Sequence, residues 1–331
     1  MQKFLIIQTA FIGDVVLATG IAEKLHQCYP QAQIDFLVRK GNEGLLARHP
    51  FLNEILIWNK KESKWSNLIK TLKKIRANKY DKAINLQRFG STGFLTAFSN
   101  AKQKIGFDKN PFSFLFSKTI KHSMQNGRHE VERNHDLVKD FTDENFAKPK
   151  LHPTEQDFNS IKPYTIQPYI CIAPSSVWFT KQYPPEKWIE LINAFPSQYK
   201  IFLIGGREDK DLCENINSSS LNKNTEVLAG HLNFLQSAAL MKNAVMNFVN
   251  DSAPLHFATA MNASVTAIFC STIPGYGFGP LSDNSFTVQT KVPLACKPCT
   301  LHGRKACPLV HYKCAFSIEK AQLLISFPGY E

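Results

Sequence analysis

Three loops of this chain combine small, hydroxylated and charged residues directly after a short apolar run. In the first loop, residues 8–14, Gly13 permits a tight turn and Asp14 stands where helical spacing begins. A carboxylate there either caps the helix or acts as a general base toward a bound hydroxyl. The loop lacks the glycine patterns of dinucleotide and P-loop sites, so neither of those sites is predicted here.

The other two loops lie in the second half of the chain, at residues 173–188 and 250–256. Each follows an apolar run and precedes a helical pattern. Their polar residues are Ser175, Ser176 and Lys181 in the one, and Asp251 and Ser252 in the other. Hydroxyls, backbone N–H groups and an ammonium are suited to a diphosphate, although ordinary helix capping also accounts for Ser and Asp in such places. Two such loops in one domain favour a nucleotide site.

The elements that must position these loops alternate between strand and helix. Predicted strands are residues 4–7, 34–38, 55–58, 83–86, 169–173, 201–204, 226–228, 245–249 and 265–269. Predicted helices are residues 15–27, 63–80, 185–195, 209–217, 233–242 and 253–261. This alternation is typical of α/β domains with doubly wound parallel sheets, whose ligands bind at the carboxyl ends of strands. The three polar loops all stand at such ends.

The length of 331 residues fits two domains better than one core. Prolines and polar residues at 149–168 predict a linker. We therefore expect domains at residues 1–155 and 165–316, followed by a C-terminal helix or tail at 317–331. No apolar run approaches the roughly 18 residues of a membrane span, and the N-terminus lacks a signal-peptide pattern, so we expect a cytoplasmic protein.

Positive charge is concentrated in the first half of the chain. Residues 1–150 contain 25 Lys and Arg against 14 Asp and Glu, a net of +11, whereas residues 151–331 contain 14 against 13, a net of +1. A field of one sign attracts anionic partners, although solubility alone also accounts for a basic surface. The asymmetry favours an anionic partner for the first domain.

Four motifs follow one another in an order found in one enzyme family. They are Ile12-Gly13-Asp14, Ser175 with Lys181-x-x-Pro184, Gly205-Gly206-x-x-Asp209, and Asn250-Asp251-Ser252-x-Pro254-Leu255-His256. From residue 1 to about residue 316 the chain resembles the ADP-heptose:lipopolysaccharide heptosyltransferases, glycosyltransferase family 9. The resemblance implies the GT-B fold, with two Rossmann-like doubly wound domains facing across a cleft. It also implies an inverting transfer that requires no metal or other cofactor.

The resemblance also assigns roles to residues. Asp14 would be the general base toward the acceptor hydroxyl, and Lys181 would neutralise the leaving diphosphate. The nucleotide sugar, by family ADP-heptose, would bind through Gly13, Ser175, Ser176, Lys181, Leu228, Ala229, Gly230, Asp251, Ser252, Pro254, Leu255 and His256. The N-terminal domain would bind an anionic lipopolysaccharide-core or related glycolipid at the inner face of the cytoplasmic membrane. Among its basic residues we expect Arg88, Arg128 and Arg133 at the acceptor.

Four of the eight cysteines fall within residues 296–314, as Cys296, Cys299, Cys307 and Cys314. In a cytoplasmic protein this grouping indicates a structural zinc site, with a loop of free thiols or a disulfide as alternatives. A second unusual segment, residues 110–118, places Phe112, Phe114 and Phe116 beside lysines. It is either core or an interfacial contact beside anionic headgroups.

Other function classes fit part of the sequence. The pI of about 9.2 suits a protein that binds nucleic acid or another anionic polymer, but no nucleic-acid-reading motif is present. A nucleotide-sugar epimerase with the same two-domain fold would turn over the donor without an acceptor. A catalytically inactive scaffold would not depend on Asp14. We expect a monomeric enzyme that does not bind nucleic acid.

Overall fold

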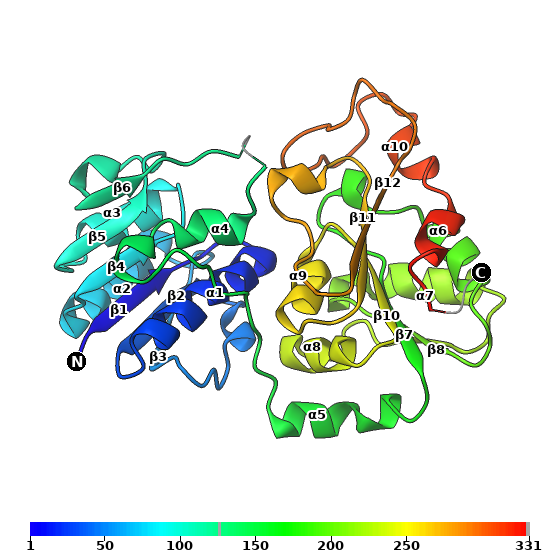
Figure 1. Ribbon diagram of the computed structural model, residues 1–331, viewed down its shortest axis with the longest axis horizontal. Helices are drawn as coiled ribbons and strands as arrows, with labels where there is room; N and C mark the ends of the chain where they lie inside the picture. Colours follow the sequence, from blue (N-terminus) through cyan, green and yellow to red (C-terminus); the bar gives the residue numbers. More distant parts are fainter. Residues whose placement is uncertain (125–126, 329–331) are drawn as a thin grey trace. The chain divides into compact units, whose positions relative to one another are not determined.

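The computed structural model describes residues 1–124 and 127–328. Contacts divide the chain into two units, Met1–His152 and Pro153–Glu331. Each unit contains one parallel six-stranded sheet with helices packed around it (Figure 1). The predicted α/β class with two doubly wound sheets is confirmed.

The first unit has the strand order β3-β2-β1-β4-β5-β6. Its strands are β1 (Lys3–Ile7), β2 (Gln33–Arg39), β3 (Glu54–Trp58), β4 (Lys82–Asn85), β5 (Gln103–Phe107) and β6 (Lys118–Ile120). Its helices are α1 (Ile12–Cys28), α2 (Lys64–Asn78), α3 (Gly90–Ala97) and α4 (Glu130–His135). α1 packs against α4, and α2 packs against α3. Because helices cover a parallel sheet on both faces, the side chains of residues 4–7 in β1 are all buried.

The second unit has the order β12-β11-β10-β7-β8-β9. Its strands are β7 (Tyr169–Ala173), β8 (Lys200–Leu203), β9 (Thr225–Val227), β10 (Met246–Asn250), β11 (Val265–Phe269) and β12 (Ser285–Gln289). Its helices are α5 (Glu155–Ile161), α6 (Pro185–Ile192), α7 (Lys210–Ser219), α8 (Phe234–Lys242), α9 (Ala253–Ala260), α10 (Lys313–Phe316) and α11 (Lys320–Leu324). Trp188 and Phe248 are among the large side chains fully buried in its core.

The segment predicted as a linker contains helix α5. Thr154 accepts a hydrogen bond from the amide of Asp157, and the Asp157 carboxylate accepts one from the amide of Thr154. This reciprocal cap starts a helix that packs against α8, so most of the segment belongs to the second unit. The segment after residue 316 is also part of that unit, because α11 packs against α6 and Phe327 is buried. Residues 329–331 of the predicted tail lie outside the described residues.

Each sheet reverses its strand order at one point. The reversal lies between β1 and β4 in the first unit, and between β7 and β10 in the second. Paired residues such as Ile7 and Asn85, or Ala173 and Val249, bring the carboxyl ends of these strands to the same edge. Open α/β sheets bind ligands at such switch points, so the loops after these four strands are the first places to look for a site.

Candidate functional site

Asn250, at the end of β10, holds the 174–184 loop against the switch point of the second unit. Its fully buried amide donates a hydrogen bond from Nδ2 to the carbonyl oxygen of Pro174 at 2.7 Å. Its Oδ1 accepts a hydrogen bond from the amide of Tyr183 at 2.9 Å. The structure therefore brings together the two polar loops that the sequence singled out in this half of the chain.

Lys181 and Asp251 form an ion pair at this edge, with 2.7 Å between Nζ and Oδ2. Their side chains are only 15% and 8% exposed. The hydroxyl of Thr272 donates to the same carboxylate oxygen at 2.6 Å. Thr272 follows β11 and was missed in the sequence, although a pair of hydroxyl residues at a strand end is the same signal that drew attention to Ser175.

The N-terminus of α9 lies at the same edge and presents the amide of Ala253. Pro254 has no N–H, and the amide of Leu255 donates to the carbonyl of Ser252. Ser252 is the N-cap residue, but its side chain makes no capping hydrogen bond. Backbone N–H groups of a first helical turn lack intrahelical partners and bind anions readily. Ser175 lies close enough to Asp209 to help lower the pKa of that carboxyl.

Asp209 acts as a helix-start residue, because its Oδ2 accepts the amide of Gly206 at 2.7 Å. A Cβ on Gly205 would lie 2.7 Å from the same oxygen, which explains the glycine at that position. Burial raises the pKa of Asp209, and its hydrogen bonds with Gly206 and Ser175 counteract that shift. Residues 209–211 therefore form a capped helix start.

Several predicted donor-binding residues lie in the interior. Leu228, Ala229 and Leu255 are at most 2% exposed, so their side chains serve the core. Gly230 reaches the surface with a φ of +79°, and a Cβ there would lie 3.0 Å from the Cα of Arg207. Ser176 and Pro254 are half-buried, while His256 is buried near the ring of Phe278. A contact of these residues with the donor stays a prediction.

The cysteine-rich segment packs onto the loop that carries Lys181. The amide of Thr180 donates to the carbonyl of Arg304 at 3.1 Å, and the amide of Arg304 donates to the Thr180 hydroxyl at 2.7 Å. Gly303 has a φ of +84°, and a Cβ there would lie 2.8 Å from Cγ of Lys181. The segment therefore helps to fix the position of the lysine, a contact that sequence spacing could not reveal.

All eight cysteines are free thiols. Cys296, Cys299 and Cys307 each influence the ionisation of Cys314, whose pKa is raised to about 11 chiefly by burial. The other three thiols thus lie within electrostatic range of Cys314, yet no three of the four sulfur atoms lie within 4.8 Å of one another. The structural zinc site stays a prediction.

In the first unit, Asp14 lies in the first turn of α1, at the switch point. Its Oδ2 accepts the amide of Phe11 at 3.1 Å, so the carboxylate does cap the helix. Gly13 precedes it in the same turn, and a contact of Gly13 with the donor stays a prediction. The hydroxyl of Thr9 donates to Oε1 of Gln87 at 2.7 Å and joins this loop to the one after β4.

Lys60 supplies a cation beside the same loop. Its Nζ donates to the carbonyl of Thr9 at 2.8 Å. Burial, helped by the charges of Arg39 and Lys64, lowers the pKa of Lys60 to about 8. The sequence analysis did not single out this residue, because it lies in a run of lysines before α2.

Arg88 and Arg133 lie near a common buried carboxylate. Arg133 is 2% exposed and pairs with Glu130 at 2.7 Å. Burial raises the pKa of Glu130, while the charges of Arg133 and Arg88 counteract the shift. Both arginines also contribute to lowering the pKa of His122 to about 4, although burial is the larger cause. Arg133 is thus occupied inside the protein, and its predicted acceptor contact stays a prediction.

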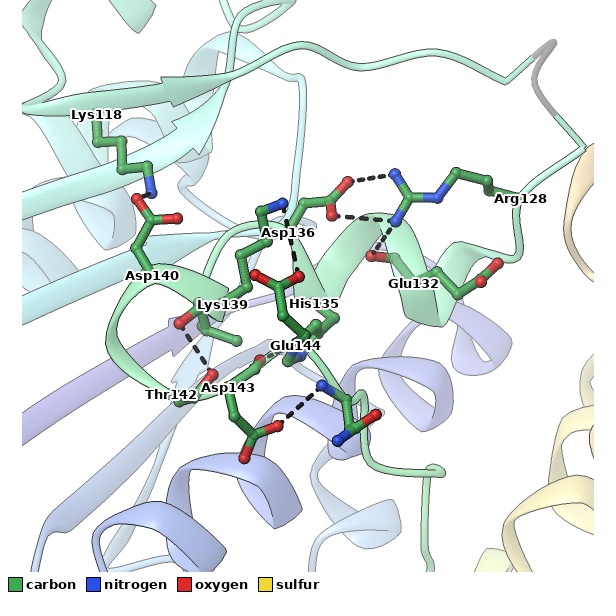
Figure 2. Close-up of polar contacts among 12 residues, drawn as sticks. Lys118, Arg128, Glu132, His135, Asp136, Lys139, Asp140, Thr142, Asp143 and Glu144 are labelled. Carbon is green, nitrogen blue, oxygen red and sulfur yellow. Dashed lines mark hydrogen bonds and ion pairs between the residues drawn. The ribbon is translucent and has the colours of Figure 1, made fainter.

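Arg128 has a different environment. Figure 2 shows its guanidinium facing Asp136, with hydrogen bonds of 2.6 and 3.0 Å to the two carboxylate oxygens. Both residues line a cavity of about 250 Å³ together with His135, Lys139 and Glu144. Arg128 is 42% exposed, and its side chain therefore faces both solvent and this polar cavity.

Within residues 1–124 and 127–328, the helices are too short or too polar to cross a lipid bilayer.

Comparison with known proteins identifies the family. Residues 68–310 match the profile of "Glycosyltransferase family 9 (heptosyltransferase)". The chain is 28% identical to lipopolysaccharide heptosyltransferase 3 of Escherichia coli over 281 residues, which is 79% of this chain and 82% of the relative. The fold is similar to that of a family 9 glycosyltransferase from Veillonella parvula, with a TM-score of 0.86, 19% identity, and coverage of 98% and 96%. It is also similar to the E. coli heptosyltransferase WaaC with ADP, with a TM-score of 0.75, 19% identity, and coverage of 87% and 93%. The expected heptosyltransferase-like GT-B fold is confirmed, and the chain belongs to glycosyltransferase family 9, the heptosyltransferases.

Proposed function

We propose that this enzyme transfers heptose from ADP-heptose to the core of lipopolysaccharide or to a related anionic glycolipid. The family and the heptosyltransferase 3 relative support the reaction. Solved structures of the relative WaaC contain ADP or a fluorinated ADP-heptose, which supports the donor. The observation that carries the proposal is the Lys181–Asp251 pair beside the N-terminus of α9, at the switch point of the second unit.

The leaving group of this reaction is a nucleoside diphosphate, whose negative charge grows as the bond to the sugar breaks. In our proposal Lys181 neutralises that charge, and the backbone N–H of Ala253 at the start of α9 donates to a phosphate oxygen. Asp251 and Thr272 hold the lysine in place. The leaving group then needs no metal ion.

Asp14 is the proposed general base. Its carboxylate takes the proton of the acceptor hydroxyl while that oxygen forms a bond to the anomeric carbon. The bond from that carbon to the diphosphate oxygen breaks, and its electron pair leaves with ADP, so configuration inverts. The hydrogen bond from the Phe11 amide fixes the orientation of the carboxylate.

The first unit also has a surface suited to a lipid-linked acceptor. We define the aromatic surface as Phe89, Phe98, Phe112, Phe114 and Leu115. Phe114 and Phe89 are 78% and 64% exposed, and the rings of Phe98 and Phe112 lie 6.4 Å apart. Lys109 and Lys121, which flank residues 112–115 in the sequence, are exposed. We propose that this surface contacts the anionic inner face of the cytoplasmic membrane.

Asp14→Asn tests the reaction, because asparagine can still accept the capping hydrogen bond but cannot act as the base. We expect transfer from ADP-heptose to heptose-deficient lipopolysaccharide to fall by roughly 10²–10⁴-fold while ADP affinity is retained. Near wild-type turnover of the variant would refute the base. Donor consumption without acceptor would instead indicate an epimerase.

Binding to vesicles that contain phosphatidylglycerol tests the aromatic surface. Phe114→Ser is expected to weaken binding, because it removes an exposed ring from the contact. Trp65→Ser is the matched control, since Trp65 lies on α2 of the same unit and is 71% exposed. Equal losses for the two variants would contradict the assignment of the surface.

A further inference from the structure

Glu23, His49 and His152 bring one carboxylate and two imidazoles together in the first unit. In the described part of the chain they form the one group of three whose ligand atoms all lie within 4.8 Å of one another. Nε2 of His152 lies 2.7 Å from Oε1 of Glu23, and Nε2 of His49 lies 3.7 Å from the same oxygen. The proposed reaction assigns no role to these residues.

Burial makes this group unusual. The side chains of Glu23 and His49 are 4% and 1% exposed, and that of His152 is 25% exposed. Nε2 of His49 has no hydrogen-bond partner among the described atoms, although it is buried. A buried polar atom without a partner costs free energy, and a ligand bound beside Glu23 would supply that partner. Nε2 of His49 faces Oε1 of Glu23, and Nε2 of His152 lies beside the same oxygen.

We propose that these three side chains bind one divalent transition-metal ion, zinc or a metal of similar preference, through both Nε2 atoms and Oε1 of Glu23. Two imidazoles and one carboxylate are a ligand set that zinc accepts with a water as fourth ligand. Metal–ligand bonds of about 2.1 Å in a tetrahedral site place ligand atoms about 3.4 Å apart. The observed 2.7 and 3.7 Å lie on either side of that spacing.

Metal binding changes the protonation of the group in a defined way. Nε2 of His152 binds a metal only without a proton, so a neutral His152 ring then carries its proton on Nδ1. Coordination through Nε2 of His49 places its ring proton on Nδ1, which now accepts the Phe51 amide at 3.3 Å. One long neutral hydrogen bond is a small loss beside three metal–ligand bonds.

Two neighbouring cations bear on the site. Nζ of Lys150 lies 3.8 Å from Oε2 of Glu23, and the lysine side chain is 56% exposed, so it can turn toward water. Lys24 is paired with Asp143 and stays out of the group. His26 stacks on the other side of Phe51, with 3.7 Å between the ring centroids, and provides a histidine close to the site that is not a ligand.

The three ligands come from distant parts of the unit. Glu23 lies on α1, the helix that begins beside Asp14, and His49 lies between the short helix at Glu43–Leu45 and β3. His152 is the last residue of the first unit. A metal bound here would fasten the end of the unit to α1, so we assign it a structural role that is separate from sugar transfer.

The test is a titration of the full chain with Co²⁺ after chelator treatment. In a variant with Cys296→Ser and Cys299→Ser, which weakens any thiolate site, we expect one Co²⁺ per chain and no sulfur-to-cobalt charge-transfer band. His152→Gln should weaken Co²⁺ binding by at least 10-fold, whereas His26→Gln should not. Binding that is absent, or that His152→Gln leaves unchanged, would overturn the proposal.

Lys150→Ala gives a second, independent outcome. Removal of a cation beside the site should tighten Co²⁺ binding, because the metal no longer competes with Lys150 for the charge of Glu23. Zinc should raise the melting temperature of the wild type and of Lys150→Ala, but not that of His152→Gln. Weaker Co²⁺ binding in Lys150→Ala would contradict the proposed site, and this variant leaves all three ligands intact.

Discussion

Replacing Lys181 separates its structural contribution from its proposed chemical one. Lys181→Met keeps most of the length of the side chain but leaves the Asp251 carboxylate buried without its ion-pair partner. Removal of one member of a buried pair costs about 3–5 kcal/mol. The 15% exposure of Lys181 places the expected loss near the lower end, at about 3 kcal/mol. For a unit of this size the loss lowers the melting temperature by roughly 6–12 °C.

The double variant with Asp251→Asn decides between the two contributions. It removes both charges, so most of the lost stability should return, with a coupling free energy of about 2 kcal/mol or more. Donor affinity and transfer rate should stay low in both variants, because phosphate charge is present in the ground state and the transition state alike. Urea unfolding, ADP calorimetry and initial rates measure the three quantities. Recovery of ADP affinity together with stability would refute the assignment of Lys181 to the leaving group.

Three further predictions follow from other parts of the structure. Gly303→Ala should weaken ADP binding several-fold, because its Cβ would lie 2.8 Å from Cγ of Lys181. Gly41→Ala is the control, since no atom lies within 4 Å of its added Cβ, and it should leave ADP binding unchanged. Equal ADP affinity in both variants would contradict this prediction. Because the pKa of His122 is lowered to about 4 in the fold, the unfolded chain binds its proton first, so the free energy of unfolding should fall as pH drops from about 6.5 to about 4. His122→Asn should flatten that slope in urea unfolding, and an unchanged slope would exclude His122 as its origin. The rate of transfer at limiting concentrations of an anionic acceptor should fall as salt rises from 0.1 to 1 M, because the Debye length falls from roughly 10 to roughly 3 Å. An equal salt dependence of the rate with a neutral acceptor analogue would refute steering by the first unit.

The sequence predicted the strands that contain an apolar run and missed β5, β6 and β12. β1 and β7 are covered on both faces and read as continuous apolar runs, so periodicity finds them. β6 has only three residues, none of them buried, and β12 buries only Val288. β5 begins with Gln103 and Lys104 and buries only its last three residues, so it too lacks a continuous apolar run that periodicity could find. Helix α5 was missed for a different reason. The prolines around it indicated a linker, although Thr154 and Asp157 cap a helix within that segment.

The same limit applies to the candidate site. Its loops could be predicted, because parallel strands must end at one edge and the polar residues follow those strands directly. The contact of Thr272 with Asp251 depends on how β11 lies beside β10, and the contact of Gly303 with Lys181 joins residues 122 positions apart (303 − 181). For Arg133 the sequence was misleading in another way. Its charge was counted in the net charge of the first half, although the side chain is buried and paired with Glu130.

The two units share a sheet topology, but the two halves of the chain differ in net charge. In the second unit the charge of Lys181 is compensated by Asp251 at 2.7 Å, so at a distance the two fields largely cancel. Residues 151–331 as a whole carry a net charge of only +1. At the site that we propose, a diphosphate would therefore interact with the pair and with the start of α9 only at hydrogen-bond range, which salt screens little. The first half, with a net of +11, attracts an anion over a longer distance, which salt screens strongly. The dissociation constant of ADP should consequently change much less with salt than the rate at limiting acceptor, and an equally steep dependence would mean that the donor, too, is drawn in by long-range charge.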